Sequence, residues 1–308
     1  MTFKFFIFET WRNLCKKWSQ VFVPLGMYTS ILEILTHFPQ LEFYKILNSQ
    51  TSFYVVVACS IIYLLIKIWP QTSFYQRIKN TDIHVGFKIG DILEVKEDDI
   101  IIPTNTTFDT SLKRDIISRH SIQGQFLIRF FKEETKQIDA MISQNLKGRN
   151  KNISSKKNKG KKARYSIGET ITIKIPGQQN CSYWVAIAEM NQNCTAHSSL
   201  PVLTQALCSL WNYINSNGEK NNLVIPIMGS GMARIPATKN KLICEIFQSF
   251  IVANKESHFS KKLTVYLHPK DLNDIDIEEV KEFICYQAKF AYPSTLEFPI
   301  NSPGIPTT

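Results

Sequence analysis

The segment 222–233 reads NLVIPIMGSGMA, and the interpretation of the whole chain starts from it. Its apolar run Leu223–Met228 ends directly at Gly229–Gly231, a pattern that predicts a buried strand opening into a tight loop. A helical pattern follows from about Ala237 to Ala253. A strand, a glycine loop and a helix in this order present backbone N–H groups and a helix N-terminus to a phosphate. The alternative is a turn without a ligand, because short glycine patterns are common by chance.

Composition places the chain among ordinary folded proteins with one unusual insertion. The chain has 308 residues, 44% of them hydrophobic, which is enough for one large domain with accessory segments. Its net charge is +10, but residues 147–164 alone hold nine Lys or Arg and no acid, so the remainder carries 10 − 9 = +1. The seven cysteines are widely spaced and form no CxxC pair, so we expect free thiols and no metal site.

The basic stretch 147–164 is almost free of apolar residues, which predicts a disordered insertion. It suits a solvated surface loop, contact with anionic lipid, or contact with nucleic acid. We expect no nucleic-acid partner, because no aromatic residues alternate with the basic ones to stack on bases.

Two apolar runs near the N-terminus predict a transmembrane hairpin. Residues 21–38 are mostly apolar apart from Glu33 and His37, and residues 53–69 are uncharged until Lys67. A bilayer core requires about 20 apolar residues, with about 17 as the lower limit. Lys and Arg are more frequent before and after the pair than between its members, so the positive-inside rule puts both ends in the cytoplasm. Buried core helices of a soluble domain are the alternative.

Strand and helix patterns alternate from Ile83 onward, which predicts an α/β domain over 83–290. Strands are expected over 84–93 and 100–102, and the alternating segment 170–175 is expected to pair with 183–188. Asp109 or Ser111 is predicted to cap a helix, and 124–147 reads as one longer helix. The predicted organisation is an interfacial or cytosolic segment over 1–20, two transmembrane helices within 21–70, the domain 83–290 with its insertion, and a flexible tail over 291–308.

Four short motifs follow one another along this domain: GDI at 90–92, DDIIIPTN at 98–105, YSIGETITIKIPG at 165–177 and PIMGSG at 226–231. They resemble, in the same order, motifs of macro domains, the fold that binds ADP-ribose. The resemblance implies a three-layer α/β/α fold with a mixed sheet and an ADP-ribose-type pocket.

The resemblance also implies roles for particular residues. Asp91 would accept a hydrogen bond from the adenine amino group, the N–H of Ile92 would read the ring, and Asn105 would face the distal ribose. The loop 229–232 would offer N–H donors to the diphosphate. The predicted set contains ligand-binding residues but no catalytic residue: Asp91, Ile92, Thr104, Asn105, Phe108, Gly229, Ser230, Gly231 and Met232.

Two departures from the macro-domain pattern affect the distal half of the pocket. Ile102 stands where the family has its first asparagine, and FDTSLK at 108–113 replaces the glycine-rich stretch that normally follows the second. ADP-ribosyl hydrolases of the family use that stretch to position ribose and water. The departures therefore favour binding without turnover. A membrane-tethered ADP-ribosyl or O-acetyl-ADP-ribose hydrolase is the alternative.

Two apolar helices before a divergent macro domain are similar to the effector subunits of type II Thoeris antiphage systems. FDTS at 108–111 and SIQGQF at 121–126 carry this likeness. It implies a receptor without a cofactor, whose ligand is an ADP-ribose conjugate, histidine–ADP-ribose, made from NAD by a partner TIR-domain protein. It further implies ligand-induced homo-oligomerisation and disruption of the bacterial inner membrane through contact with its lipid, with the macro domain in the cytoplasm.

Overall fold

A computed structural model describes residues 10–11, 14–15, 18–38, 40, 50–68, 71–113, 116–153 and 158–291. The chain divides into two compact units, 1–72 and 73–308, which are described separately. Most of the predicted segment 1–20, most of residues 39–52 between the two predicted membrane helices, and nearly all of the predicted tail 291–308 lie outside the described residues.

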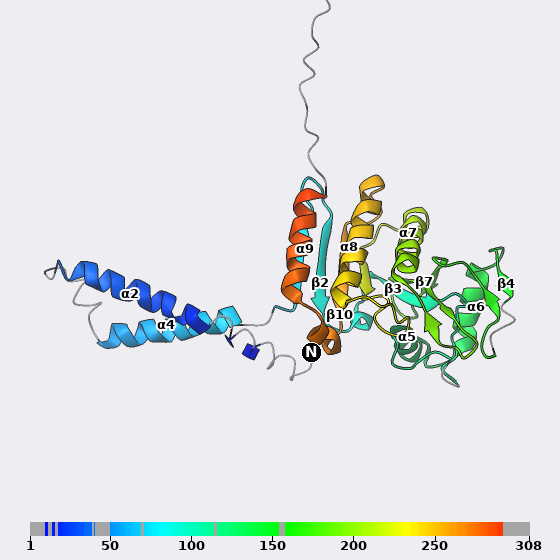
Figure 1. Ribbon diagram of the computed structural model, residues 1–308, viewed down its shortest axis with the longest axis horizontal. Helices are drawn as coiled ribbons and strands as arrows, with labels where there is room; N and C mark the ends of the chain where they lie inside the picture. The colour runs from blue at the N-terminus through cyan, green and yellow to red at the C-terminus, as the bar shows by residue number, and fades with distance from the viewer. Residues whose placement is uncertain are drawn as a thin grey trace, which may run out of the picture. The chain divides into compact units, whose positions relative to one another are not determined.

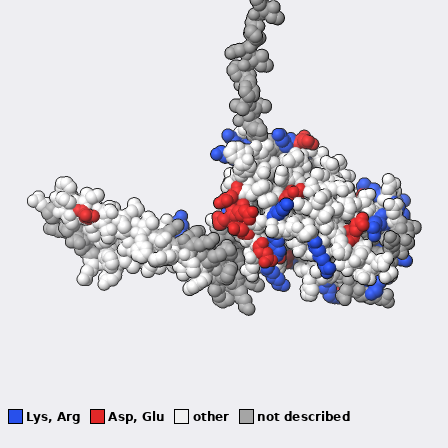
Figure 2. Space-filling view, viewed as in Figure 1, with Lys and Arg blue, Asp and Glu red and all other residues white. Residues whose placement is uncertain are grey.

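The described part of the N-terminal unit contains three apolar helices: η1 (Trp18–Val21), α2 (Phe22–Leu35) and α4 (Gln50–Ile68). Helices α2 and α4 contact each other, and the face of these helices that Figure 2 shows carries few charged side chains. Within the described part of the chain, one helix is long and apolar enough to cross a membrane, over Gln50–Lys67, and only 6% of that window is buried. Helix α2, with 14 residues, is shorter than the span predicted over 21–38.

The second unit is built on an eight-stranded mixed sheet (Figure 1). The order is β1-β2-β10-β9-β3-β7-β6, with β8 beside β7. Strands β2, β10, β9, β3 and β7 are parallel, so their carboxyl ends meet at one edge, whereas β1, β6 and β8 are antiparallel to their neighbours. The bounds are β1 (Ser73–Arg77), β2 (His84–Ile89), β3 (Asp99–Asn105), β6 (Thr170–Lys174), β7 (Cys181–Met190), β8 (Ala196–His197), β9 (Leu223–Pro226) and β10 (Lys262–Leu267).

Helices cover both faces of this sheet, which confirms the predicted three-layer arrangement. One face carries α7 (Leu200–Asn217), α8 (Lys239–Glu256) and α9 (Ile277–Phe290), and the other carries α5 (Ile122–Phe131) and α6 (Thr135–Asn145) (Figure 1). The predicted pairing of 170–175 with 183–188 is also confirmed, because Thr170 lies opposite Val185.

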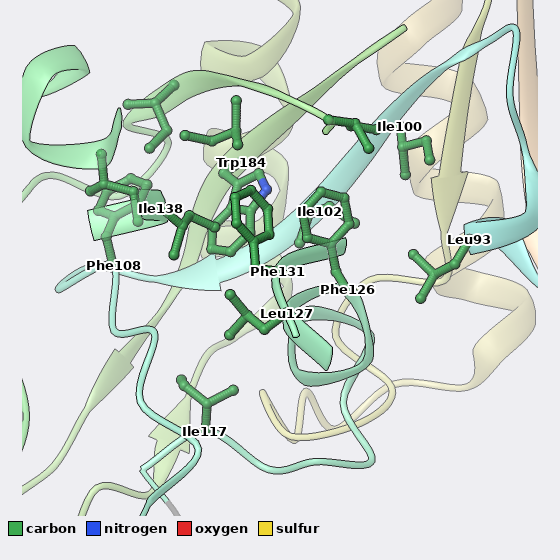
Figure 3. Packing of buried hydrophobic residues seen from close by; sticks show 14 of the residues in the cluster. Leu93, Ile100, Ile102, Phe108, Ile117, Phe126, Leu127, Phe131, Ile138 and Trp184 are labelled. Carbon is green, nitrogen blue, oxygen red and sulfur yellow. The ribbon is translucent and has the colours of Figure 1, made fainter. Parts of the chain in front are cut away.

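A single apolar cluster fills the space between the sheet and the α5–α6 layer (Figure 3). Trp184 of β7 and Phe126 of α5 are fully buried and meet edge to face, with ring centroids 5.6 Å apart. Ile100 and Ile102 of β3 point into the same cluster. Because β3 is buried on both faces, its apolar run is continuous rather than alternating, as parallel central strands require.

The amino ends of the central strands are held by the buried carboxylate of Asp99. Its Oδ1 accepts from the backbone N–H of Cys181 at 2.9 Å, and its Oδ2 accepts from the Tyr183 hydroxyl and the Asn221 amide, both at 3.3 Å. Burial, reinforced by this carboxylate, raises the pKa of the Cys181 thiol to about 12. All seven cysteines are free. The hydrogen bonds of Asp99 therefore hold the amino ends of these strands together. The candidate site lies at the opposite edge, at the carboxyl ends of the strands.

Two predicted helices differ from the observed ones. No helix is capped by Asp109 or Ser111 in the described residues that follow them; α5 instead begins after Ser121, whose Oγ accepts from the N–H of Gly124 at 3.0 Å. The single helix predicted over 124–147 is two helices, because Lys132 and Glu133 adopt positive φ angles of 49° and 65° between them. A run of apolar residues at helical spacing did not reveal this interruption.

The strand predicted over 84–93 is also shorter than expected. β2 ends at Ile89, and Asp91 caps a 3-10 helix, η2 (Ile92–Glu94), by accepting from the N–H of Leu93 at 2.9 Å. Sequence alternation could not separate the two elements, because Ile92 and Leu93 are as apolar as the strand that precedes them.

The composition of the basic insertion predicted disorder, but part of the insertion is ordered. Two short strands, β4 (Asn152–Ile153) and β5 (Ala163–Arg164), pair within it. Arg164 forms an ion pair with Glu189 at 3.0 Å and donates to the carbonyl of Met190 at 3.2 Å. Composition alone cannot detect these long-range contacts, which hold the described end of the insertion against β7.

Candidate functional site

A cleft of about 840 Å³ lies at the carboxyl ends of the parallel strands. Much of its lining comes from Gly90–Ile92 after β2, Pro103–Asn105 at the end of β3, 229–234 after β9 and 116–123 before and at the start of α5. This volume lies in the range of small-molecule sites, and the edge formed by the strand carboxyl ends is where open α/β sheets bind ligands. The sheet therefore brings together three of the four sequence motifs.

The glycine loop 227–238 is folded on itself. The carbonyl of Gly229 accepts from the N–H of Ile235 at 3.0 Å, and the carbonyl of Gly231 accepts from Arg234 at 3.1 Å. Gly229 has φ +88°, and a Cβ at this position would lie 2.4 Å from Cδ1 of Ile235. Only glycine adopts this backbone without strain.

The loop leaves its amides available to a ligand. Among the described residues, none accepts a hydrogen bond from the backbone N–H of Gly229, Ser230, Gly231 or Met232, and all four residues line the cleft. Consecutive N–H groups without internal partners form a concave binding site for an anion. All four were predicted as ligand-binding residues, and Met232 is 52% exposed at the rim.

The predicted contribution of the helix N-terminus to this loop is wrong. Helix α8 begins at Lys239, well beyond the glycines, and Oγ1 of Thr238 accepts from the N–H of Lys241 at 3.3 Å. A capping side chain occupies one of the donors that a phosphate would need. The first residues of α8 are not among the residues that line the cleft, whereas Gly229–Met232 are.

Asp91 lies at one end of the cleft beside Ile92, as the GDI motif predicted. Its Oδ2 is 3.1 Å from Nη1 of Arg129, a residue of α5 that sequence reasoning missed. A carboxylate offers about four acceptor positions, so its bonds to Leu93 and Arg129 leave capacity for a ligand donor. The pairing joins residues 38 positions apart and had no local signal.

Asn105 is buried at the end of β3, where a register shift against β7 aims it at the cleft. Its Oδ1 accepts from the N–H of Thr107 at 2.9 Å and lies 2.7 Å from that residue's Oγ1. Its amide nitrogen makes no hydrogen bond to any described residue and is thus a donor for a ligand. Thr104 also lines the cleft, with its Oγ1 buried and without a partner in the described ranges.

The prediction that Phe108 binds the ligand is wrong. Phe108 has φ +47° and no solvent exposure, and its ring meets Tyr165 edge to face at 5.8 Å. It belongs to the apolar cluster rather than to the cleft lining. Ile102, at the position of the family's first asparagine, is likewise in that cluster. The positive φ of Phe108 turns its ring into the core, which sequence spacing could not indicate.

Three basic side chains in the cleft lining were also missed: Arg119, Arg234 and Lys270. Arg119 is paired bidentately with Glu133 at 2.8 and 2.6 Å. Arg234 lies three residues after Gly231, and this proximity is a signal that sequence reading could have used. Tyr266 of β10 also lines the cleft. Burial raises its pKa to about 12, so its hydroxyl remains a neutral donor at physiological pH.

A mixed sheet in this order, with a glycine loop and a polar cleft at its parallel strand ends, defines a macro-type domain. The chain belongs to the family described as "Thoeris protein ThsA, Macro domain", whose model matches residues 85–268. It is 27% identical over 206 residues to the Thoeris protein ThsA of Bacillus amyloliquefaciens (strain Y2), covering 65% of this chain and 67% of that protein. The predicted relationship to Thoeris effectors is thereby confirmed.

Solved structures of macrodomains are also similar to the chain. The Oceanobacillus iheyensis macrodomain with ADP is 14% identical, with a TM-score of 0.45, and covers 70% of this chain and 94% of its own. The Trypanosoma brucei macrodomain in complex with ADP-ribose is 10% identical, with a TM-score of 0.43, and covers 68% and 73%.

Proposed function

We propose that the chain is a membrane-anchored receptor and effector whose macro domain binds an ADP-ribose-derived signal of the histidine–ADP-ribose type. A partner TIR-domain protein makes this signal from NAD. Binding promotes homo-oligomerisation, and the N-terminal helices then disrupt the inner membrane of the bacterial cell. The macro domain lies on the cytoplasmic side of this membrane. The ligand is a signal, and no step of its chemistry is assigned to this chain.

The observation that carries the proposal is the set of four unpartnered amides at 229–232 inside a cleft that also holds Asp91 and Asn105. A diphosphate carries negative charge and only acceptor oxygens, so a run of N–H donors suits it. An acceptor at Asp91 suits the adenine amino group, and the amide donor of Asn105 suits a ribose hydroxyl. One molecule of the ADP-ribose class carries all three groups.

Binding without turnover is favoured by the loop that follows Asn105. Residues 105–110 are buried. The side chain of Phe108 lies in the apolar cluster, and the side chain of Asp109 accepts hydrogen bonds from Thr107 and Lys161. A hydrolase must place a water molecule beside the distal ribose, and the family's glycine-rich stretch, which does so, is absent here.

The deciding experiment is calorimetry of the full-length protein in detergent with ADP-ribose and with its histidine conjugate. We expect both to bind, and the conjugate to bind more tightly. Chromatography of the mixture is expected to recover the ligand intact. Absence of binding by the wild type would refute the receptor, whereas release of free ADP-ribose from the conjugate would favour the hydrolase alternative.

Replacing Asp91 with Asn is expected to weaken ADP-ribose binding about tenfold, because the amide presents only one acceptor atom in place of two. The loss should be much smaller for inosine diphosphate ribose, which lacks the amino group that Asp91 would accept. Calorimetry with both nucleotides measures this difference. Glu97→Gln removes an exposed carboxylate nearby and serves as the matched control. Equal losses for the two nucleotides would contradict the adenine role.

Membrane anchoring is supported by the N-terminal helices. Their exposed side chains include Met27, Ile34, Tyr54, Ile62 and Ile66, and exposed apolar surface on this scale requires a covering. Helix α4 is about 28 Å long, and η1 and α2 follow each other directly for about 29 Å, close to a bilayer core of roughly 30 Å.

The full-length protein is accordingly expected to sediment with membranes and to require detergent for release. High salt and alkaline carbonate, which remove peripheral proteins, should leave it in the pellet. Recovery of the intact protein in the soluble fraction without detergent would remove the effector mechanism, although it would leave the ligand site untouched.

A further inference from the structure

We propose that Lys161, in the basic insertion, is a positioning residue for the distal half of the ligand cleft. The inference rests on the proposed function, because it concerns how Asn105 is held toward the distal ribose of an ADP-ribose-type ligand. Composition suggested a solvated insertion, yet this lysine contacts three residues, Phe108, Asp109 and Asp139, in two segments that are far from it in sequence.

The first step links Asn105 to Asp109. Oδ1 of Asn105 accepts from the N–H groups of Thr107 and Asp109, at 2.9 and 3.4 Å. Oγ1 of Thr107 lies within hydrogen-bond distance of both Asn105 Oδ1 and Asp109 Oδ2. Because these bonds occupy the oxygen of Asn105, its NH2 group is the part that faces the cleft, and its orientation depends on the loop 105–110.

The second step links Asp109 to Lys161. Asp109 is only 1% exposed, and a buried carboxylate must be compensated by donors. Its Oδ1 accepts from the backbone N–H of Lys161 at 2.7 Å. The Lys161 ammonium donates to the carbonyl of Phe108 at 2.8 Å, so one residue fixes both the side chain and the backbone of the loop.

The third step anchors the lysine to a helix. Its Nζ lies 2.6 Å from Oδ1 of Asp139 in α6, and the same oxygen accepts from Oγ1 of Thr110 at 2.7 Å. The backbone nearby is tied in as well, because the N–H of Tyr165 donates to the carbonyl of Thr106 at 2.8 Å. The lysine thus holds the loop 105–110 against α6 at a place where the glycine-rich stretch of other macro domains is missing.

The contacts of Lys161 indicate which part of a ligand should lose affinity when this lysine is replaced. Asp91 and the amides at 229–232 do not take part in the Lys161 network. The affinity for ligand groups bound at these positions should therefore not depend on Lys161. A ligand that reaches Asn105 should depend on it. ADP ends at the diphosphate, whereas ADP-ribose extends to the distal ribose, and the pair separates the two halves of the cleft.

The test compares the affinities of the full-length protein in detergent for ADP-ribose and ADP, with Lys161→Met beside Lys162→Met. Lys162 is exposed and one residue away, so it matches the loss of charge without the network. We expect Lys161→Met to lower ADP-ribose affinity about tenfold, the effect of one lost charge-assisted hydrogen bond, and to leave ADP affinity within about twofold. Lys162→Met should change neither.

A second variant protects the test against a folding failure of the first. Asp139→Asn loosens the lysine from α6 without altering the insertion, and it should shift the ADP-ribose to ADP ratio in the same direction by a smaller factor. A wild-type ratio retained in folded Lys161→Met, or an equal loss for both ligands, would overturn the inference. Failure of the wild type to bind either nucleotide would instead overturn the proposed function.

Discussion

Replacing Gly229 with alanine is expected to weaken ADP-ribose binding between about tenfold and 100-fold. An L-residue in the left-handed region costs about 1–2 kcal/mol, and φ +88° lies beyond its favourable range. The new Cβ would also lie 2.4 Å from Cδ1 of the buried Ile235, so either this side chain or the loop must shift. Binding must then restore the strained loop, and each 1.4 kcal/mol of that strain is about tenfold in affinity.

The matched control for this substitution is Gly231→Ala, two residues further along the same loop. No atom lies within 4 Å of a Cβ built on Gly231, and its φ is not in the left-handed region. Gly231→Ala should therefore leave the melting temperature unchanged, whereas Gly229→Ala should lower it. Calorimetry and thermal unfolding of both variants measure the two effects. Wild-type affinity in Gly229→Ala would show that the loop amides are not the anion site.

Replacing Gly124 with alanine is expected to destabilise the macro domain by about 3 kcal/mol. Gly124 lies in the first turn of α5, where helix propensity alone predicts that alanine would stabilise by about 0.5–1 kcal/mol. The tertiary contact predicts the opposite sign, because a Cβ would lie 2.1 Å from the backbone oxygen of Ser118. A backbone atom cannot turn away as a side chain can, so the helix and the loop must separate.

The same substitution should also weaken ligand binding. Residues 116–123 line the cleft directly before and at the start of α5, and a displaced loop would alter that wall. Thermal unfolding in detergent is expected to show a melting temperature lower by roughly 6–12 °C, scaled from 3 kcal/mol for a domain of this size. Gly231→Ala again provides the same chemical change without a contact. An increase in melting temperature would mean that propensity outweighs the steric conflict.

Sequence reading was most successful where a local pattern leads directly into a structural position. Within the apolar run Leu223–Met228, Leu223–Pro226 form the strand β9, and the glycines follow its carboxyl end. Asp91 follows the parallel strand β2, and Asn105 ends the parallel strand β3. Parallel strands place their carboxyl ends at one edge, so motifs that directly follow such strands must converge. The order of four motifs was sufficient to predict the fold and the place of the cleft.

Long-range pairing accounts for what sequence reading missed. Arg129 reaches Asp91 over 38 positions, and Lys161 reaches Asp109 over 52. Phe108 looked like part of the site because it follows Asn105 closely, yet its positive φ sends the ring into the core. None of these contacts changes local hydrophobic periodicity, which is the signal that sequence reading uses.

At Gly229–Gly231 the sequence by itself determined a strand followed by a tight loop, because an apolar run and two glycines constrain the backbone locally. Only the tertiary structure decided that the carbonyls of the loop accept hydrogen bonds from the N–H groups of Arg234 and Ile235. The same fold leaves four consecutive amides without partners among the described residues. It also decided that Thr238 caps α8, whose first residues do not line the cleft. A hydrogen-bond donor is available to a ligand only when the rest of the fold has left it unpaired, and no local pattern records that.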